Sequence, residues 1–157
     1  MPTRRIQRFL HDHGVKYVTI SHSPAFTSQE IAAAAHVCGK DFAKSVVVKL
    51  DGRLALAVVP ASVKIDLALV REVTGAERVE LANEADFAAH FPECEPGAMP
   101  PFGNLYGMPV YVDEHLREDR EITFNAGTHR ELIRMTFRDF VRIVAPKLVP
   151  LTMGVRA

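Results

Sequence analysis

The sequence has little of what several common classes of protein depend on. Only two of its 157 residues are cysteines, Cys38 and Cys94, and their spacing matches no metal-binding motif. We therefore expect two free thiols in a reducing compartment. No apolar run approaches the roughly 18 residues that span a membrane, and residues 1–6 lack the apolar core of a signal peptide. These absences predict a cytoplasmic protein without a membrane segment.

Net charge is absent too, because 19 Lys and Arg residues balance 19 Asp and Glu residues. The field of the whole molecule will not draw it onto nucleic acid, so DNA is not an expected partner and any contact with RNA needs a local basic patch. One candidate patch lies in the first turns of the chain, at Arg4, Arg5 and Arg8. A second set of arginines is spaced by four residues: Arg130, Arg134, Arg138 and Arg142. This set extends across a predicted change from strand to helix, which favours separate, solvated side chains over one basic stripe.

Familiar catalytic signatures are missing as well. The motifs GxSxG, HExxH, GxxxxGK[ST] and GxGxxG do not occur, so a serine-hydrolase elbow, a zinc-protease site and a nucleotide-phosphate loop are unsupported. None of the seven histidines has the spacing of a metal ligand pair. His22 and His129 each lie beside a turn, where a pocket-lining histidine and a loop histidine bonded to backbone both fit the pattern. We expect no metal and no cofactor.

What the chain does contain is a lysine inside an apolar, strand-like run. Three consecutive valines occupy positions 46–48, and Asp51-Gly52 is a strong hairpin signal. Burying an ammonium group without a partner is costly or lowers its pKa, so Lys44 predicts a pocket that holds a polar or anionic group. Lys49 has the opposite parity and is expected to be solvated. An edge strand protected by its lysine is the alternative.

A stiff loop is the second unusual feature. Residues 95–103 contain prolines at 96, 100 and 101 and glycines at 97 and 103. Proline fixes φ, whereas glycine permits positive φ and close approach of the backbone. Such a loop can present the backbone N–H groups of Ala98 and Met99 to a ligand carbonyl. A rigid surface connection explains the composition equally well.

Periodicity and turn residues predict one domain over residues 1–157 that mixes helices with hairpins. Helices are expected at 4–13, 31–37, 66–73, 83–91 and 137–144. Strands are expected at 15–21, 42–50, 53–59, 78–81, 109–112, 121–125 and 132–135, with a tail from residue 147. This order favours an α+β fold with a mixed sheet or partial barrel.

Together these pieces resemble the YbaK/prolyl-tRNA-synthetase-associated domain family of aminoacyl-tRNA deacylases, over about residues 15–144. Each matching stretch is short, but their order and spacing are specific in combination. The stretches are 22–24, 27–32, 43–48, 58–60, 64–67, 95–103, 110–114, 126–127 and 139–140.

The resemblance implies a mixed, barrel-like β-sheet flanked by helices. It also implies a hydrolase that acts in trans on the carboxylic ester joining an amino acid to the 3′ end of a mischarged tRNA. Lys44 matches the key pocket residue of the family and is the implied catalytic residue. The implied substrate-binding residues are His22, Gly97, Ala98, Met99, Pro100, Pro101, Phe102, Ala126 and Gly127. The implied partners are the tRNA 3′ end and an aminoacyl-tRNA synthetase, with neither a protein nucleophile nor a metal.

Two positions depart from the family pattern. Many relatives have a second glycine where Ala98 stands, and Pro100 occupies a position that is often small or polar. Both lie in the loop that shapes the amino-acid pocket, so the resemblance leaves the amino acid open among small uncharged ones. The alternative function is a module of the same fold that binds tRNA or a synthetase without cleaving the ester. A hydrolase of another acyl ester is a third reading.

Overall fold

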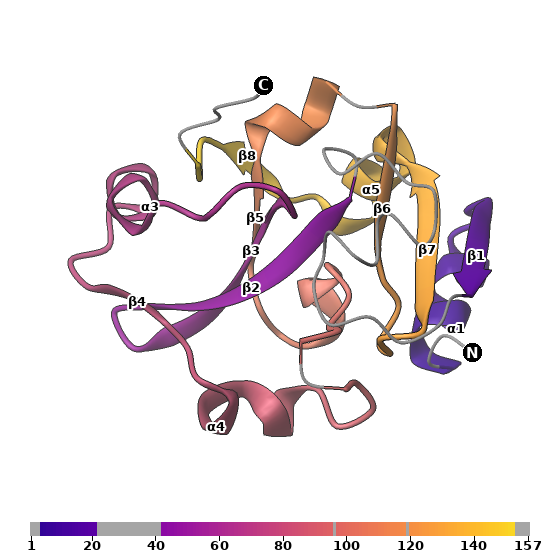
Figure 1. Ribbon diagram of the computed structural model, residues 1–157, viewed down its shortest axis with the longest axis horizontal. Coiled ribbons are helices and arrows are strands. Elements are labelled where there is room, and N and C mark those ends of the chain that lie inside the picture. Colours follow the sequence, from indigo (N-terminus) through magenta and orange to yellow (C-terminus); the bar gives the residue numbers. More distant parts are fainter. Residues whose placement is uncertain (1–3, 22–41, 96, 119, 153–157) are drawn as a thin grey trace.

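The computed structural model describes residues 4–21, 42–95, 97–118 and 120–152 (Figure 1). Its helices are α1 (Arg4–Asp12), α3 (Leu67–Thr74), α4 (Glu84–Phe87) and α5 (Phe137–Val144), with short 3-10 helices η1 (Ala88–His90), η2 (Gly103–Leu105) and η3 (Glu114–Glu118). Its strands are β1 (Tyr17–Ser21), β2 (Ala43–Leu50), β3 (Arg53–Pro60), β4 (Val79–Leu81), β5 (Val110–Asp113), β6 (Glu121–Asn125), β7 (Glu131–Thr136) and β8 (Lys147–Val149).

A five-stranded sheet is built around the predicted hairpin. The strand order is β4-β2-β3-β5-β8, with antiparallel pairs on the β4 side and parallel pairs from β3 to β8. Asp51 and Gly52 join β2 to β3 with φ angles of 51° and 85°, which is the backbone that an Asp-Gly hairpin turn requires. The hairpin prediction is therefore confirmed.

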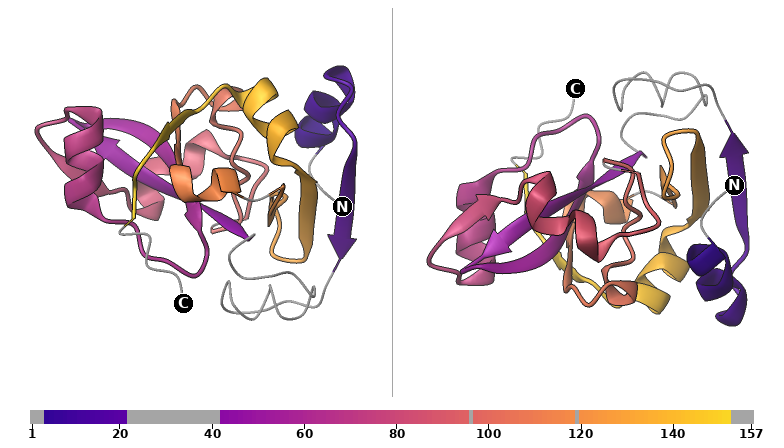
Figure 2. Two further views of the ribbon diagram at one scale, coloured as in Figure 1. Left: turned by 90° about the horizontal axis from the view of Figure 1, so that it is seen from above. Right: turned by 90° about the horizontal axis from the view of Figure 1, so that it is seen from below.

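A second, three-stranded sheet has the order β1-β7-β6 and is antiparallel throughout. One isolated parallel bridge, between Phe42 and Thr123, joins it to the five-stranded sheet. The mixed α and β class is confirmed, although the strands in the described ranges form two sheets and no closed barrel. The three-stranded sheet and α3 lie at opposite ends of the molecule in all views (Figures 1 and 2).

The larger hydrophobic core lies between the two sheets. The five-stranded sheet contributes Leu56 and Val58 to it, and the three-stranded sheet contributes Phe124 and Ile133. Because successive strand residues point to opposite faces, the intervening Ala55 and Ala57 of β3 join a smaller cluster beneath α3. Strand β3 is thus buried on both faces, with Leu56 and Val58 toward the larger core and Ala55, Ala57 and Val59 toward the smaller cluster.

Local capping signals place the helices. Asp66 accepts hydrogen bonds from the first backbone N–H groups of α3, and Gly75 ends the helix at φ 75°. Asn83 and Asp86 form a capping box at α4, but the helix predicted to reach residue 91 is divided into α4 and η1. In the described ranges no helix has the length and hydropathy needed to cross a bilayer.

The predicted C-terminal tail is wrong, because residues 147–149 form β8. This strand pairs in parallel with β5, which is distant in sequence. The following segment is held by the fully buried Asp113, which accepts a hydrogen bond from the Thr152 hydroxyl. The helix predicted at 31–37 and the predicted site residue His22 lie outside the described residues.

Candidate functional site

Lys44 lies near the start of β2, opposite Val59 of β3. Its side chain is half-buried rather than fully solvated. Burial lowers the pKa of Lys44 below its usual value, and the positive charge of Lys64, in the segment between β3 and α3, lowers it further. A half-buried ammonium group beside a second cation is suited to binding an anion.

The pleat of β2 fixes the direction of Lys44. Ala43 and Val47 point into the larger core, so Lys44 points to the opposite side. We call this side of the two sheets, away from the larger core, the outer face. The parallel bridge between Phe42 and Thr123 continues the outer face from β2 onto β6, because paired residues of parallel strands point the same way.

Asn125 is on this outer face, two residues beyond Thr123, as Lys44 is two residues beyond Phe42. It is only 7% exposed, and its side-chain oxygen Oδ1 is buried without a hydrogen-bond partner among the described residues. A buried carboxamide oxygen that lacks a hydrogen-bond partner destabilises a fold by about 1–3 kcal/mol. Such a group is suited to receiving its hydrogen bond from a ligand.

The end of β6 brings the stiff loop to the same place. Gly127 donates a backbone hydrogen bond of 3.0 Å to the Ala98 carbonyl and accepts one of 2.8 Å from Glu95. The Glu95 carboxylate in turn accepts a 2.7 Å hydrogen bond from the His129 backbone N–H. Gly97 has a φ of 83°, and a Cβ added there would lie 3.3 Å from His129 Cε1. The structure therefore brings Gly97, Ala98, Gly127 and His129 together.

The inside of the loop differs from the expectation in one respect. The Ala98 N–H donates a 3.0 Å hydrogen bond to the Glu95 carbonyl, so it is not available to a ligand. The Met99 N–H has no partner within the described residues and can still serve as a donor. The loop residues Pro100 and Pro101 are buried.

Phe102 anchors the loop in the larger core. It is fully buried, and its ring packs against Phe9, Phe124 and Phe140 at centroid distances of 5.3, 5.2 and 6.2 Å. Met99 is 6% exposed and belongs to the same core. These contacts hold the loop rigidly against β6. Across the described ranges no hydrogen bond or ion pair joins Lys44 to the loop, and β6 with Asn125 is the element between them.

Other features contribute less. A hollow of about 780 Å³ lies at the far end of the β2–β3 hairpin, bordered by residues 50–55 and 106–109, and it holds none of the predicted site residues. Burial raises the pKa of the Cys94 thiol, which contacts the Tyr106 hydroxyl at 3.7 Å. In the described part of the chain, no three His, Cys, Asp or Glu side chains gather as metal ligands.

Sequence reasoning missed one residue of this site and left another undecided. Asn125 carries no local signal, because an asparagine at the end of a strand is common at turns. His129 had a signal, its place after Gly127-Thr128, but only the contact with Gly97 shows that it faces the loop.

Comparison with known proteins bears on the whole arrangement. The model of the aminoacyl-tRNA editing domain matches residues 22–143. The Escherichia coli protein named multifunctional Ser/Thr-tRNA deacylase ProXp-y is 26% identical over 151 residues, which cover 93% of this chain and 90% of the relative.

Solved structures agree with the family match. A proposed trans-editing enzyme for prolyl tRNA synthetase superposes with a TM-score of 0.82 at 26% identity, covering 96% of both chains. A hypothetical protein with 18% identity has a TM-score of 0.85, over 95% of this chain and 99% of its own, and supports the fold alone. The resemblance noted in the sequence is confirmed, and the chain belongs to the aminoacyl-tRNA editing domain family.

Proposed function

We propose that this protein is a trans-acting aminoacyl-tRNA deacylase, which hydrolyses the ester of mischarged tRNA. The observation that carries the proposal is the family match over residues 22–143, a range that contains Lys44, the stiff loop and Asn125. Two relatives support it, one named as a Ser/Thr-tRNA deacylase and one as a proposed trans-editing enzyme. Editing of this kind is needed because a synthetase pocket separates side chains differing by one methylene by only about 1–3 kcal/mol.

The outer face and the adjoining loop together offer a binding group for each part of the charged tRNA end. Lys44, assisted by Lys64, attracts the phosphate of the terminal adenosine. The Asn125 carboxamide oxygen accepts a hydrogen bond from the free ribose hydroxyl of that adenosine. The Met99 N–H donates to the ester carbonyl, where negative charge develops during attack.

The reaction in this arrangement needs no side-chain nucleophile. A water oxygen attacks the ester carbonyl carbon, with the free 2′-hydroxyl of the substrate assisting. The bond between that carbon and the ribose oxygen then breaks, and the ribose oxygen takes up a proton. The products are the free amino acid and a tRNA with its terminal hydroxyl restored. The rate gain comes from holding the ester, the hydroxyl and the water in one geometry.

Deacylation of a panel of mischarged tRNAs tests the proposal. Wild type should hydrolyse at least one small, uncharged aminoacyl ester faster than buffer, and Lys44→Ala should lose most of this activity. Lys49→Ala is the matched control, because Lys49 is on the same strand with opposite parity and pairs with Asp86 at 3.1 Å. If no ester is hydrolysed above the buffer rate, the proposal fails. If Lys44→Ala retains wild-type activity, the role of Lys44 fails.

One observation favours a second candidate function, a module that binds tRNA or a synthetase without cleavage. The Ala98 N–H is already bonded to the Glu95 carbonyl, at a loop position where the resemblance noted in the sequence implies a glycine in many members of the family. A loop with one donor fewer stabilises the developing negative charge less. Saturable binding of charged tRNA, with the ester intact at the buffer rate, would establish this candidate. An increase in deacylation on adding an aminoacyl-tRNA synthetase would identify that enzyme as a partner.

A further inference from the structure

A hollow of about 630 Å³ lies where β6 and α5 begin. It is lined by Arg117, Arg120, Glu121, Thr136, Phe137 and Arg138. The three arginines are exposed, and within the described ranges their side chains form no ion pair or hydrogen bond. The lining itself carries three guanidinium groups and one carboxylate, so it is locally positive in a protein of zero net charge, although Glu118 and Asp119 stand between Arg117 and Arg120 in the sequence.

The hollow opens at one end of the outer face. Glu121 lies opposite Thr136 in the β6–β7 ladder, and the next positions of the same parity are Thr123 opposite Arg134. The half-buried Arg134 therefore stands on the outer face between the hollow and Asn125. We call Arg117, Arg120, Arg138 and Arg134 the arginine track.

The length of the track fits a short stretch of single-stranded nucleic acid. Four strand steps separate Glu121 from Asn125 on β6, which is roughly 13 Å at about 3.3 Å per residue. Stacked nucleotides rise about 3.4 Å each along one strand, so this distance corresponds to about four nucleotides. The unpaired 3′ end of a tRNA has a comparable length.

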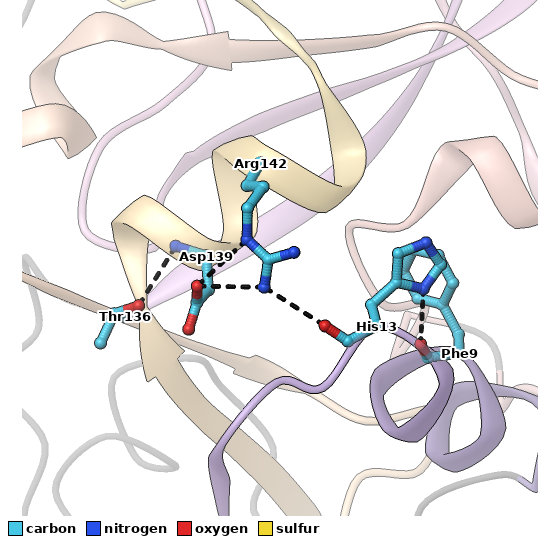
Figure 3. A network of polar contacts seen from close by, with 5 residues as sticks. All are labelled: Phe9, His13, Thr136, Asp139 and Arg142. Carbon is cyan, nitrogen blue, oxygen red and sulfur yellow. Dashed lines mark hydrogen bonds and ion pairs between the residues drawn. The ribbon is translucent and has the colours of Figure 1, made fainter.

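Arg142, the last of the four arginines spaced by four residues, does not belong to the track. Arg142 is held by Asp139 at 3.2 Å and by the His13 carbonyl at 3.3 Å, where it fastens α1 to α5 (Figure 3). The four arginines spaced by four therefore divide among a turn, strand β7 and helix α5, and they form no continuous stripe on one helix. Only Arg134 and Arg138 of that set lie on the track.

We infer that the arginine track binds the backbone phosphates of the tRNA 3′ end and of the adjoining stem. The inference rests on the proposed function, because it leads the charged end along β6 to Asn125 and Lys44. Guanidinium groups bind phosphates through paired, charge-assisted hydrogen bonds, and Arg is the residue best suited to that geometry. Since the whole molecule has no net charge, this patch supplies the electrostatic attraction that tRNA binding requires.

The test uses a triple variant, Arg117→Gln/Arg120→Gln/Arg138→Gln. Its matched control is Arg53→Gln/Arg71→Gln/Arg78→Gln, which removes the same charge from exposed positions on the hairpin, α3 and the start of β4. Each protein is assayed on an aminoacyl-tRNA and on the corresponding aminoacyl-adenosine, which lacks the phosphates. We expect the track variant to raise KM for aminoacyl-tRNA at least tenfold while its rate on aminoacyl-adenosine stays that of wild type. The salt dependence of log Kd for uncharged tRNA should become less steep by about 0.7 for each lost contact.

Two results would overturn the inference. One is an equal rise of KM in the control triple, which would show a response to total charge. The other is an equal loss on aminoacyl-adenosine, which would show damage to the site. A wild type that cleaves neither ester would refute the proposed function instead. Binding of uncharged tRNA by wild type, the track variant and the control would still test the inference about the arginine track, because only the track variant should bind more weakly than wild type.

Discussion

Replacing Asn125 with leucine should make the protein more stable and less active. Leucine has a similar volume but no polar atoms, so Asn125→Leu removes a 93% buried carboxamide whose oxygen has no partner in the described residues. Removing the unsatisfied oxygen should stabilise the fold by about 1–3 kcal/mol. Imperfect packing of leucine should offset up to about 1 kcal/mol of this gain. We expect the free energy of unfolding to rise by about 1–2 kcal/mol. For a chain of this size the melting temperature should rise by roughly 2–8 °C.

The same substitution removes the proposed acceptor for the ribose hydroxyl. A hydrogen bond of about 1–1.5 kcal/mol corresponds to a decrease of roughly five- to tenfold in the deacylation rate. Thermal unfolding gives the first quantity, and single-turnover hydrolysis of a mischarged tRNA gives the second. Substituting a residue with only a structural role would not raise the free energy of unfolding while lowering the deacylation rate.

Ser45→Ala is the control for this experiment. The Ser45 hydroxyl is also buried without a partner in the described ranges, but its parity is that of Ala43 and Val47, which point into the larger core. Its removal should leave deacylation unchanged without lowering stability. If Asn125→Leu lowers the free energy of unfolding by more than about 1 kcal/mol, or leaves hydrolysis at the wild-type rate, the reasoning about Asn125 is refuted.

Three further experiments test Lys44, Gly97 and Asp113. Burial lowers the pKa of Lys44, so the ammonium group loses its proton at a lower pH than an ordinary lysine does. Enzymatic hydrolysis, measured above the buffer rate, should therefore decline as the pH rises through that lowered pKa. The unfolded chain then binds more protons than the folded one, so the free energy of unfolding of wild type relative to Lys44→Met should increase with pH up to about 10.5, as urea unfolding can show. Gly97→Ala should lower the free energy of unfolding by about 1–2 kcal/mol and also lower deacylation, because the new Cβ is strained at positive φ and presses on His129. Gly14→Ala is the control: Gly14 has a φ of 64° but open space around it, so this change should reduce stability without affecting hydrolysis. Asp113→Ala should lower the free energy of unfolding by about 2–4 kcal/mol in the same assay, because this buried carboxylate accepts hydrogen bonds from two side chains.

The parts of the fold with local signals were predictable. Asp51-Gly52 marks the hairpin, and Asp66 with Gly75 marks both ends of α3, because each signal acts within a few residues of the structure it determines. Strand β8 has no such signal. It exists because its backbone pairs with β5, which lies far away in the sequence, and periodicity in a three-residue strand is too short to detect.

The candidate site divides in the same way. The half-burial of Lys44 follows from its apolar strand, so composition alone indicated it. The hydrogen bond of the Ala98 N–H depends on a turn with Glu95, and the lack of a partner for Asn125 Oδ1 depends on the position of every neighbouring group. Arg134 was expected in a strand, but the sequence does not show that the β6–β7 ladder places it beside Arg117, Arg120 and Arg138, because strand pairing joins segments that are distant in the chain.

Two features that do not favour folding occur on one face of the molecule. Lys44 is half-buried although its charge is disfavoured there, and the Asn125 side-chain oxygen Oδ1 is buried without a hydrogen-bond partner in the described part of the chain. A sequence selected for stability alone would place apolar residues at both positions, because each would then contribute burial without a desolvation cost. Both groups become favourable once an anion and a hydroxyl donor are bound. Their joint placement on the outer face, with Asn125 between Lys44 and the loop, therefore argues for a site whose polar groups are completed by the substrate.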